Sequence, residues 1–201
     1  SNPTLKGILP MRLHTLIAAA GLTAVAVAVP AMAADYVTEP THTHAYFEIS
    51  HFGAAVNRVR FDKEEGKIQF DPAAKTGHVE LTIDASSLNS GVPPFDAHLK
   101  GADIFDVEKH PTIKFVSDKF HFKGDKVSAV DGQLTIKGKT HPVTLKASQF
   151  ACYQSPMLKR EVCGGDFSAT IDRTQWGLDY GMGMVAGKEV KLIATVEAVR
   201  Q

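Results

Sequence analysis

The sequence lacks an excess of charge of either sign. Its 201 residues include 22 Lys and Arg against 22 Asp and Glu, so the formal net charge is zero. A nucleic-acid site would need clustered basic residues, and a site for anionic lipid surfaces would need a polybasic patch. Neither pattern is present, and we expect no nucleic-acid partner.

Common catalytic motifs are also missing. The chain contains no Gly-x-Ser-x-Gly, no His-Glu-x-x-His and no glycine-rich phosphate loop. Asp103 and Asp106 could share a helical face with Lys100, but such carboxylates more simply solvate a short helix than perform acid–base chemistry. We therefore expect a protein that is not an enzyme and needs no cofactor.

A metal site finds little support. His42 and His44 are two residues apart and would point the same way on a strand. A zinc site needs three or four converging ligands, and the spacing identifies no third one. Surface histidines are the better interpretation, and we expect no metal.

A long apolar run is absent as well, apart from one near the start. Met11 is followed by Arg12, an apolar run over 16–29 and the small-residue segment 30–34. This order is typical of a cleavable signal peptide, here Met11–Ala33. A membrane-spanning helix would need roughly 20 apolar residues. We expect no stable membrane insertion, a periplasmic or secreted protein and a single domain over 34–201, and we exclude the ten residues before Met11 from the argument.

Cysteine is scarce: Cys152 and Cys163 are the only two. Their spacing matches neither a redox Cys-x-x-Cys nor a zinc motif. In an exported chain, two cysteines most simply form a disulfide. We predict that this bond restrains a long connection between a strand that ends at Phe150 and one that begins near Phe167.

From Thr43 onward, apolar and polar residues alternate with a period of two, which is typical of half-buried strands. Ala45, Phe47 and Ile49 alternate with polar neighbours, and later runs repeat the pattern up to Val190–Val196. Short turn signals separate the runs, at Glu65-Gly66 and Lys137-Gly138 for example. About eight such strands predict an all-β antiparallel sandwich or barrel, between which the period does not decide.

The alternation fails once, over Leu88–Lys109. Pro93-Pro94 excludes a central strand there. We predict a short helical segment near residues 95–109 that packs over one end of the sheet.

The same region carries a family resemblance. Asp96-Ala97-His98-Leu99-Lys100, then Phe105-Asp106, His110-Pro111 and Phe115-Val116-Ser117 resemble the central signature of YceI-like proteins. The segments 132–140, 173–178 and 44–52 resemble further blocks of that family, in order along nearly the whole mature chain. Phe95 stands where the family usually has Arg, and the cysteine pair is not a general family feature.

The resemblance implies an eight-stranded, lipocalin-like β-barrel with an elongated dry cavity. It also implies a polyisoprenoid ligand, such as an isoprenoid quinone or a polyprenyl phosphate, and a homodimer as a further expectation. We therefore expect a periplasmic carrier of a long apolar isoprenoid lipid, ubiquinone-like by a narrow preference, because Phe95 removes a cation that a phosphate would favour. The alternatives are an enzyme that modifies such a lipid and a ligand-free secreted interaction or stress protein.

The candidate site residues are mostly apolar, as a cavity for such a lipid requires. Asp96 and His98 are candidates for contact with a polar head group, although a helix cap and a structural histidine explain them equally well. Trp176 and Tyr180 are placed at the cavity mouth, because each ring has one polar end. The cavity candidates are Phe47, Ile83, Phe105, Phe115, Leu134, Ile136, Phe167, Ile171, Trp176 and Tyr180.

Overall fold

The computed structural model describes residues 33–201, and nearly all of the predicted signal peptide lies outside this range. The described residues form one compact unit. Within the described range, no helix combines the length and the apolar character that crossing a membrane would require.

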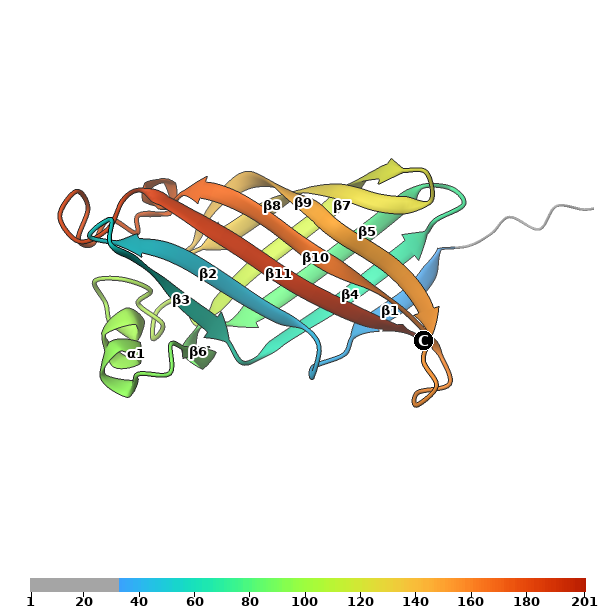
Figure 1. Ribbon diagram of the computed structural model, residues 1–201, viewed down its shortest axis with the longest axis horizontal. Coiled ribbons are helices and arrows are strands. Elements are labelled where there is room, and N and C mark those ends of the chain that lie inside the picture. Colours follow the sequence, from blue (N-terminus) through green and yellow to red (C-terminus); the bar gives the residue numbers. More distant parts are fainter. Residues whose placement is uncertain (1–32) are drawn as a thin grey trace, which may run out of the picture. The chain divides into compact units, whose positions relative to one another are not determined.

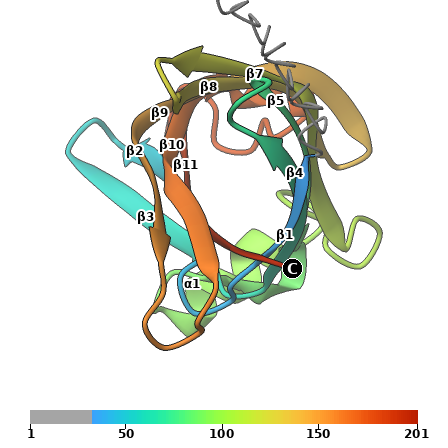
Figure 2. The same cartoon turned by 90° about the vertical axis from the view of Figure 1, so that its right-hand side faces the viewer.

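The strands form a closed antiparallel barrel, which confirms the predicted fold (Figures 1 and 2). The ring order is β1–β4–β5–β7–β8–β9–β10–β11, and it closes because β1 pairs with both β4 and β11. Strands β2, β3 and β6 continue the sheet from β11. The strands are β1 (Ala34–Thr38), β2 (His44–His51), β3 (Ala55–Phe61), β4 (Glu64–Asp71), β5 (Thr76–Asp84), β6 (Leu88–Asn89), β7 (Thr112–Lys123), β8 (Lys126–Ile136), β9 (Lys139–Gln154), β10 (Glu161–Asp172) and β11 (Glu189–Arg200).

The period of two places one set of side chains inside the barrel, because successive strand residues point to opposite faces. In β2 the inward residues are Ala45, Phe47 and Ile49, and in β11 the inward set includes Leu192 and Ala194. The turn at Lys137-Gly138 is confirmed: both residues have positive φ, as a tight two-residue hairpin turn requires.

The helical segment is shorter than predicted. Helix α1 covers Pro93–Lys100, with proline in its first turn, where a missing N–H costs nothing. The following residues 101–110 form turns rather than helix. Two 3₁₀ turns, η1 (Ala85–Ser87) and η2 (Arg173–Trp176), complete the elements.

The predicted turn at Glu65-Gly66 is wrong, because Gly66 lies within β4. Its N–H donates to the Thr38 hydroxyl at 2.8 Å, and a Cβ at this position would lie 2.8 Å from the Thr38 methyl group. The glycine therefore permits β1 to pack closely on β4 and does not mark a chain reversal.

The disulfide between Cys152 and Cys163 is present, but not in the predicted place. Strand β9 continues to Gln154 and β10 already begins at Glu161, so the two cysteines face each other as a cross-strand pair. Their Cα atoms are 4.0 Å apart. The bond therefore ties two strands that are already hydrogen-bonded, and the connecting loop is only 155–160.

Removing the disulfide with Cys152→Ala and Cys163→Ala should destabilise the barrel by about 2–3 kcal/mol in the chain-entropy model. For a chain of this size we expect a melting temperature lower by about 5–10 °C. Reduction of the native protein should reproduce this loss. Two freely reactive thiols in the untreated protein would contradict the disulfide.

A buried carboxylate lies where β4 begins. The Glu64 side chain is 2% exposed; its Oε1 accepts a hydrogen bond from the Ala45 N–H at 2.8 Å, and its Oε2 lies 3.9 Å from the His44 Nδ1. That buried nitrogen has no hydrogen-bond partner among the described residues, so His44 is not the surface residue that the sequence indicated. Burial raises the pKa of Glu64 to about 7, and the nearby Asp62 adds to the shift, while the Ala45 N–H and Arg60 oppose it.

The raised pKa of Glu64 predicts a pH dependence of stability. Between about pH 4.5 and 7 the native protein retains a proton that the unfolded chain has released, so the contribution of Glu64 to the free energy of unfolding falls as the pH rises. Glu64→Gln should therefore stabilise the protein more, or destabilise it less, at pH 8 than at pH 5 in urea titrations. Glu65→Gln, at the exposed neighbouring position, is the matched control, and an equal effect of Glu64→Gln at both pH values would contradict the assignment.

Candidate functional site

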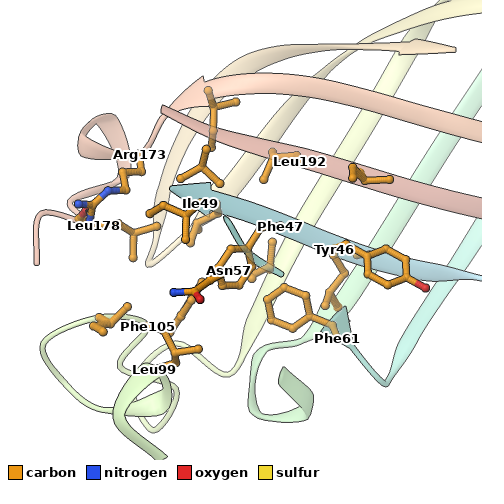
Figure 3. A pocket seen from close by; sticks show the side chains of 18 of the residues that line it. Tyr46, Phe47, Ile49, Asn57, Phe61, Leu99, Phe105, Arg173, Leu178 and Leu192 are labelled. Carbon is orange, nitrogen blue, oxygen red and sulfur yellow. Dashed lines mark hydrogen bonds between the residues drawn. The ribbon is translucent and has the colours of Figure 1, made fainter. Parts of the chain in front are cut away.

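The barrel encloses a cavity of about 390 Å³, part of whose lining is drawn in Figure 3. It lies at the end of the barrel that carries α1, whose position Figure 1 shows. This volume is within the usual range for small-molecule sites. Its walls are apolar side chains from the strands, with Leu99 of α1 and Phe105 of the following turns at one side. Phe47, Phe61 and Phe105 form a cluster with ring centroids 5.8–6.2 Å apart.

A second cavity of about 90 Å³ follows deeper in the barrel. Tyr36, Phe70 and Phe150 contribute to its lining. The two cavities share four lining residues, Leu81, Phe115, Leu145 and Ala194. They therefore follow one another along the barrel interior, which we call the lumen, and these four side chains, which we call the neck, lie between them.

The inward residues of β11 show how far this lumen extends. Val190 lines the larger cavity and Ala198 the smaller one. Eight residue steps at about 3.3 Å each correspond to about 26 Å along the strand. Several inward side chains, Phe167 and Leu192 among them, are only partly buried, because the space beside them is not filled by other side chains.

Most predicted cavity residues lie on this lumen. Phe167 lines the smaller cavity. The larger cavity is lined by Phe47, Ile83, Phe105, Phe115, Leu134, Ile136, Ile171 and Tyr180.

Trp176 is the exception, because it lies in the barrel wall and not at the mouth. Strands β9 and β10 pair only as far as Lys146 and Ser168, and towards η2 they separate. The Trp176 ring is 1% exposed and its Nε1–H donates to the Leu134 carbonyl at 3.0 Å. It borders residues of both separated strands, so it seals the gap between them.

The two polar candidates have different positions. His98 lines the larger cavity, and its ring meets that of Tyr180 edge to face at 4.9 Å between centroids. Asp96 is not part of the lining; its Oδ1 accepts a hydrogen bond from the Ser90 N–H at 2.7 Å and so fixes the turn before α1. Phe95 lines the cavity, in the place where the family resemblance leads one to expect an arginine.

Sequence reasoning missed Asn57, which projects into the larger cavity. Figure 3 shows its amide among the side chains of Ile49, Phe47 and Leu99. Asn57 shares the inward face of β3 with Val59 and Phe61. The alternation of these three residues with their outward neighbours could have indicated the strand. The polar side chain of Asn57 on the inward face makes that alternation of apolar and polar residues less clear.

Arg173 was also missed as a site residue. It is buried and lines the same cavity. Its guanidinium donates to the carbonyl oxygens of Gly187 at 2.9 Å, Ala186 at 3.5 Å and Leu178. Burial lowers the pKa of Arg173, and Asp179 and Asp172 oppose the shift. Its first role is therefore to hold the loop between η2 and β11 in place.

The comparison with family models gives a match over residues 36–198 to the YceI-like domain. The chain belongs to the YceI-like family. Its relatives include a protein of Pseudomonas aeruginosa (strain LESB58) named "UPF0312 protein", which is 34% identical over 93% of this chain and 98% of the relative. A Vibrio cholerae relative is 32% identical over 91% of this chain and 97% of its own.

Solved structures show the same YceI-like fold at lower identity. BcnA of Burkholderia cenocepacia superposes with a TM-score of 0.67 at 23% identity, over 80% of this chain and 98% of BcnA. A structure described as a polyisoprenoid binding domain from Saccharophagus degradans superposes with a TM-score of 0.59 at 14% identity, over 85% of this chain and all of that one.

Proposed function

We propose that this protein is a periplasmic binding and carrier protein for one long apolar isoprenoid lipid. The observation that carries the proposal is the pair of adjacent cavities in the lumen. The deep cavity is lined mainly by aromatic and aliphatic side chains, and most polar lining groups belong to the other cavity. The similarity to the Saccharophagus polyisoprenoid binding domain supports the same ligand class. The predicted signal peptide and the disulfide support an oxidising compartment outside the cytoplasm.

The lumen suits an apolar chain better than a compact polar ligand. Transfer of apolar surface from water contributes roughly 25 cal/mol per Å², and the walls from Phe47 to Phe150 offer such an environment along the barrel. A tail that occupies both cavities has to pass between Phe115 and Ala194, which line both of them. The geometry therefore favours a tail in the deep part and a head group at the mouth.

The head group that the mouth favours is neutral, as in an isoprenoid quinone. Asn57 and His98 can donate hydrogen bonds to a quinone carbonyl at the edge of the larger cavity. Arg173 directs its donors to three loop carbonyls, and Phe95 supplies no charge. A phosphate would need charge-assisted donors that this mouth does not concentrate.

Narrowing the neck tests the position of the tail. The full chain is expressed in its native host, the purified protein is extracted with organic solvent, and the lipids are identified by mass spectrometry. Wild type should yield a long-chain isoprenoid close to one per protein. Ala194→Phe should reduce this yield several-fold or select shorter tails, because a phenyl ring fills the neck.

Ala151→Phe is the matched control, since Ala151 is exposed on β9 and absent from both cavity linings. Ala45→Phe, inside the larger cavity, provides a second narrowed lumen if Ala194→Phe packs too tightly to fold. Extracts without any long-chain lipid across several preparations would refute the carrier proposal. Unchanged lipid in both folded lumen variants would refute the position of the tail.

Competition between a quinone and a polyprenyl phosphate tests the head group. Ubiquinone should displace the phosphate lipid from the protein, and Asn57→Leu should weaken quinone binding by about tenfold, as the loss of a hydrogen bond of about 1 kcal/mol plus an unpaired carbonyl predicts. Asn89→Leu, at the exposed position of β6 and outside the cavity, should leave the affinity unchanged. Tighter binding of the phosphate lipid would overturn the preference.

A further inference from the structure

Three connecting segments surround the opening of the larger cavity. They are the β2–β3 hairpin (50–57), the segment before and into α1 (90–95) and the loop after η2 (180–187), and we call them the mouth loops. The Phe52 N–H donates to the Val185 carbonyl at 2.8 Å, and His98 of α1 contacts Tyr180. The hairpin, the helix and the loop therefore lie together at one end of the barrel (Figure 1).

The mouth loops contain no Asp, Glu, Lys or Arg. Their sequences are Ser-His-Phe-Gly-Ala-Ala-Val-Asn, Ser-Gly-Val-Pro-Pro-Phe and Tyr-Gly-Met-Gly-Met-Val-Ala-Gly. At the opposite end of the barrel every hairpin connection is charged: 71–76 contains Lys75, 123–126 contains Asp125, and 155–160 contains Lys159 and Arg160. The mouth loops thus differ in formal charge from the hairpin connections at the opposite end of the barrel.

Large apolar side chains of the mouth loops project into solvent. Met184 is 80% exposed, Phe52 65% and Val92 52%. Phe52 and Gly53 both have positive φ at the hairpin tip, a tight turn that holds the aromatic ring outward. Exposed apolar groups that gather at one place mark an interaction site more often than scattered ones do.

We propose that the mouth loops dock the protein on the surface of a lipid bilayer, so that the ligand passes directly between the bilayer and the lumen. This inference rests on the proposed lipid-carrier function. It is supported by continuity: the same three loops supply lining residues of the cavity, among them Ser50, Phe95, Tyr180 and Val185. An apolar chain that leaves the bilayer through the mouth would meet no formal charge from these loops.

The charge pattern also defines the type of membrane contact. The flanking segments at this end carry both signs, with Asp103 and Glu108 beside Lys109 and Lys137, so they form no basic patch for anionic lipids. Docking is then driven by partial insertion of Phe52 and Met184 into the interface, as in other peripheral proteins that bury apolar side chains there. It should depend little on salt or on anionic lipid.

Vesicle flotation tests the docking surface. The full chain is expressed in a Gram-negative host, and the N-terminus of the purified protein is read by mass spectrometry so that all variants are compared in the same form. Wild type should float with vesicles of phosphatidylcholine alone, equally at low and high salt. Phe52→Glu with Met184→Glu should reduce the partition coefficient by at least about tenfold, because two buried apolar side chains are replaced by charges.

Met157→Glu is the matched control: Met157 is 84% exposed but lies in the loop at the opposite end, and its replacement should leave flotation unchanged. Lipid loaded from detergent micelles separates docking from cavity binding. The mouth variant should still take up a quinone from detergent, while its transfer of quinone from vesicles should slow by a similar factor.

Several results would overturn the docking proposal. These are no flotation of wild type, flotation that needs anionic lipid and is lost in salt, or an equal loss in Met157→Glu. A wild-type dimer that the mouth variant converts to monomer, without vesicle binding by either, would assign this surface to a second copy of the chain. Failure of quinone uptake from detergent by wild type would instead contradict the carrier function.

Discussion

The structure depends on strand β11, because one of its edges pairs with two different strands, β1 and β2. Its residues Ala198–Arg200 pair with β1 and close the ring, whereas Val190–Thr195 pair with β2. Backbone groups of an unpaired edge would be exposed, and closure removes that edge. Because β1 also pairs with β4, an eight-stranded ring forms, which is wide enough to enclose one small ligand. At the other end of the barrel, β11 pairs with β2 instead of β1. The strands there end in loops, and the lumen opens between these loops.

This arrangement separates two environments along one barrel. In the deep part, inward residues such as Phe70 and Phe150 surround the lumen with carbon atoms. Towards the mouth, Asn57, His98 and Tyr180 add hydrogen-bonding groups to the lining. Trp176 closes the wall where β9 and β10 separate. An amphipathic lipid with a long tail and a small polar head matches this order, and a ligand of uniform polarity does not.

The sequence predicted the parts of this design that arise from a local pattern. Alternation identified most strands and the inward residues, and the block around His98 identified the family. Strand β3 was missed because Asn57 interrupts its apolar face, and Asn57 was therefore not recognised as a cavity residue. The position of Trp176 depends on strands that separate, and that of Gly66 on close packing against Thr38. Such features arise from contacts between segments that are distant in the sequence, and the hydrophobic periodicity of one segment does not indicate them. The cysteine pairing was predicted correctly, but the lengths of β9 and β10 were not.

In the proposed carrier, one lumen, from the mouth to the neck and beyond, holds a single extended tail. A crystal structure of the protein purified from its native host without detergent tests this most directly. The account predicts continuous density for a chain that starts beside Asn57 and His98, passes the neck at Phe115 and Ala194, and ends near Phe150. A lumen filled by repacked side chains, or a lipid bound only on the outer surface of the barrel, would contradict it.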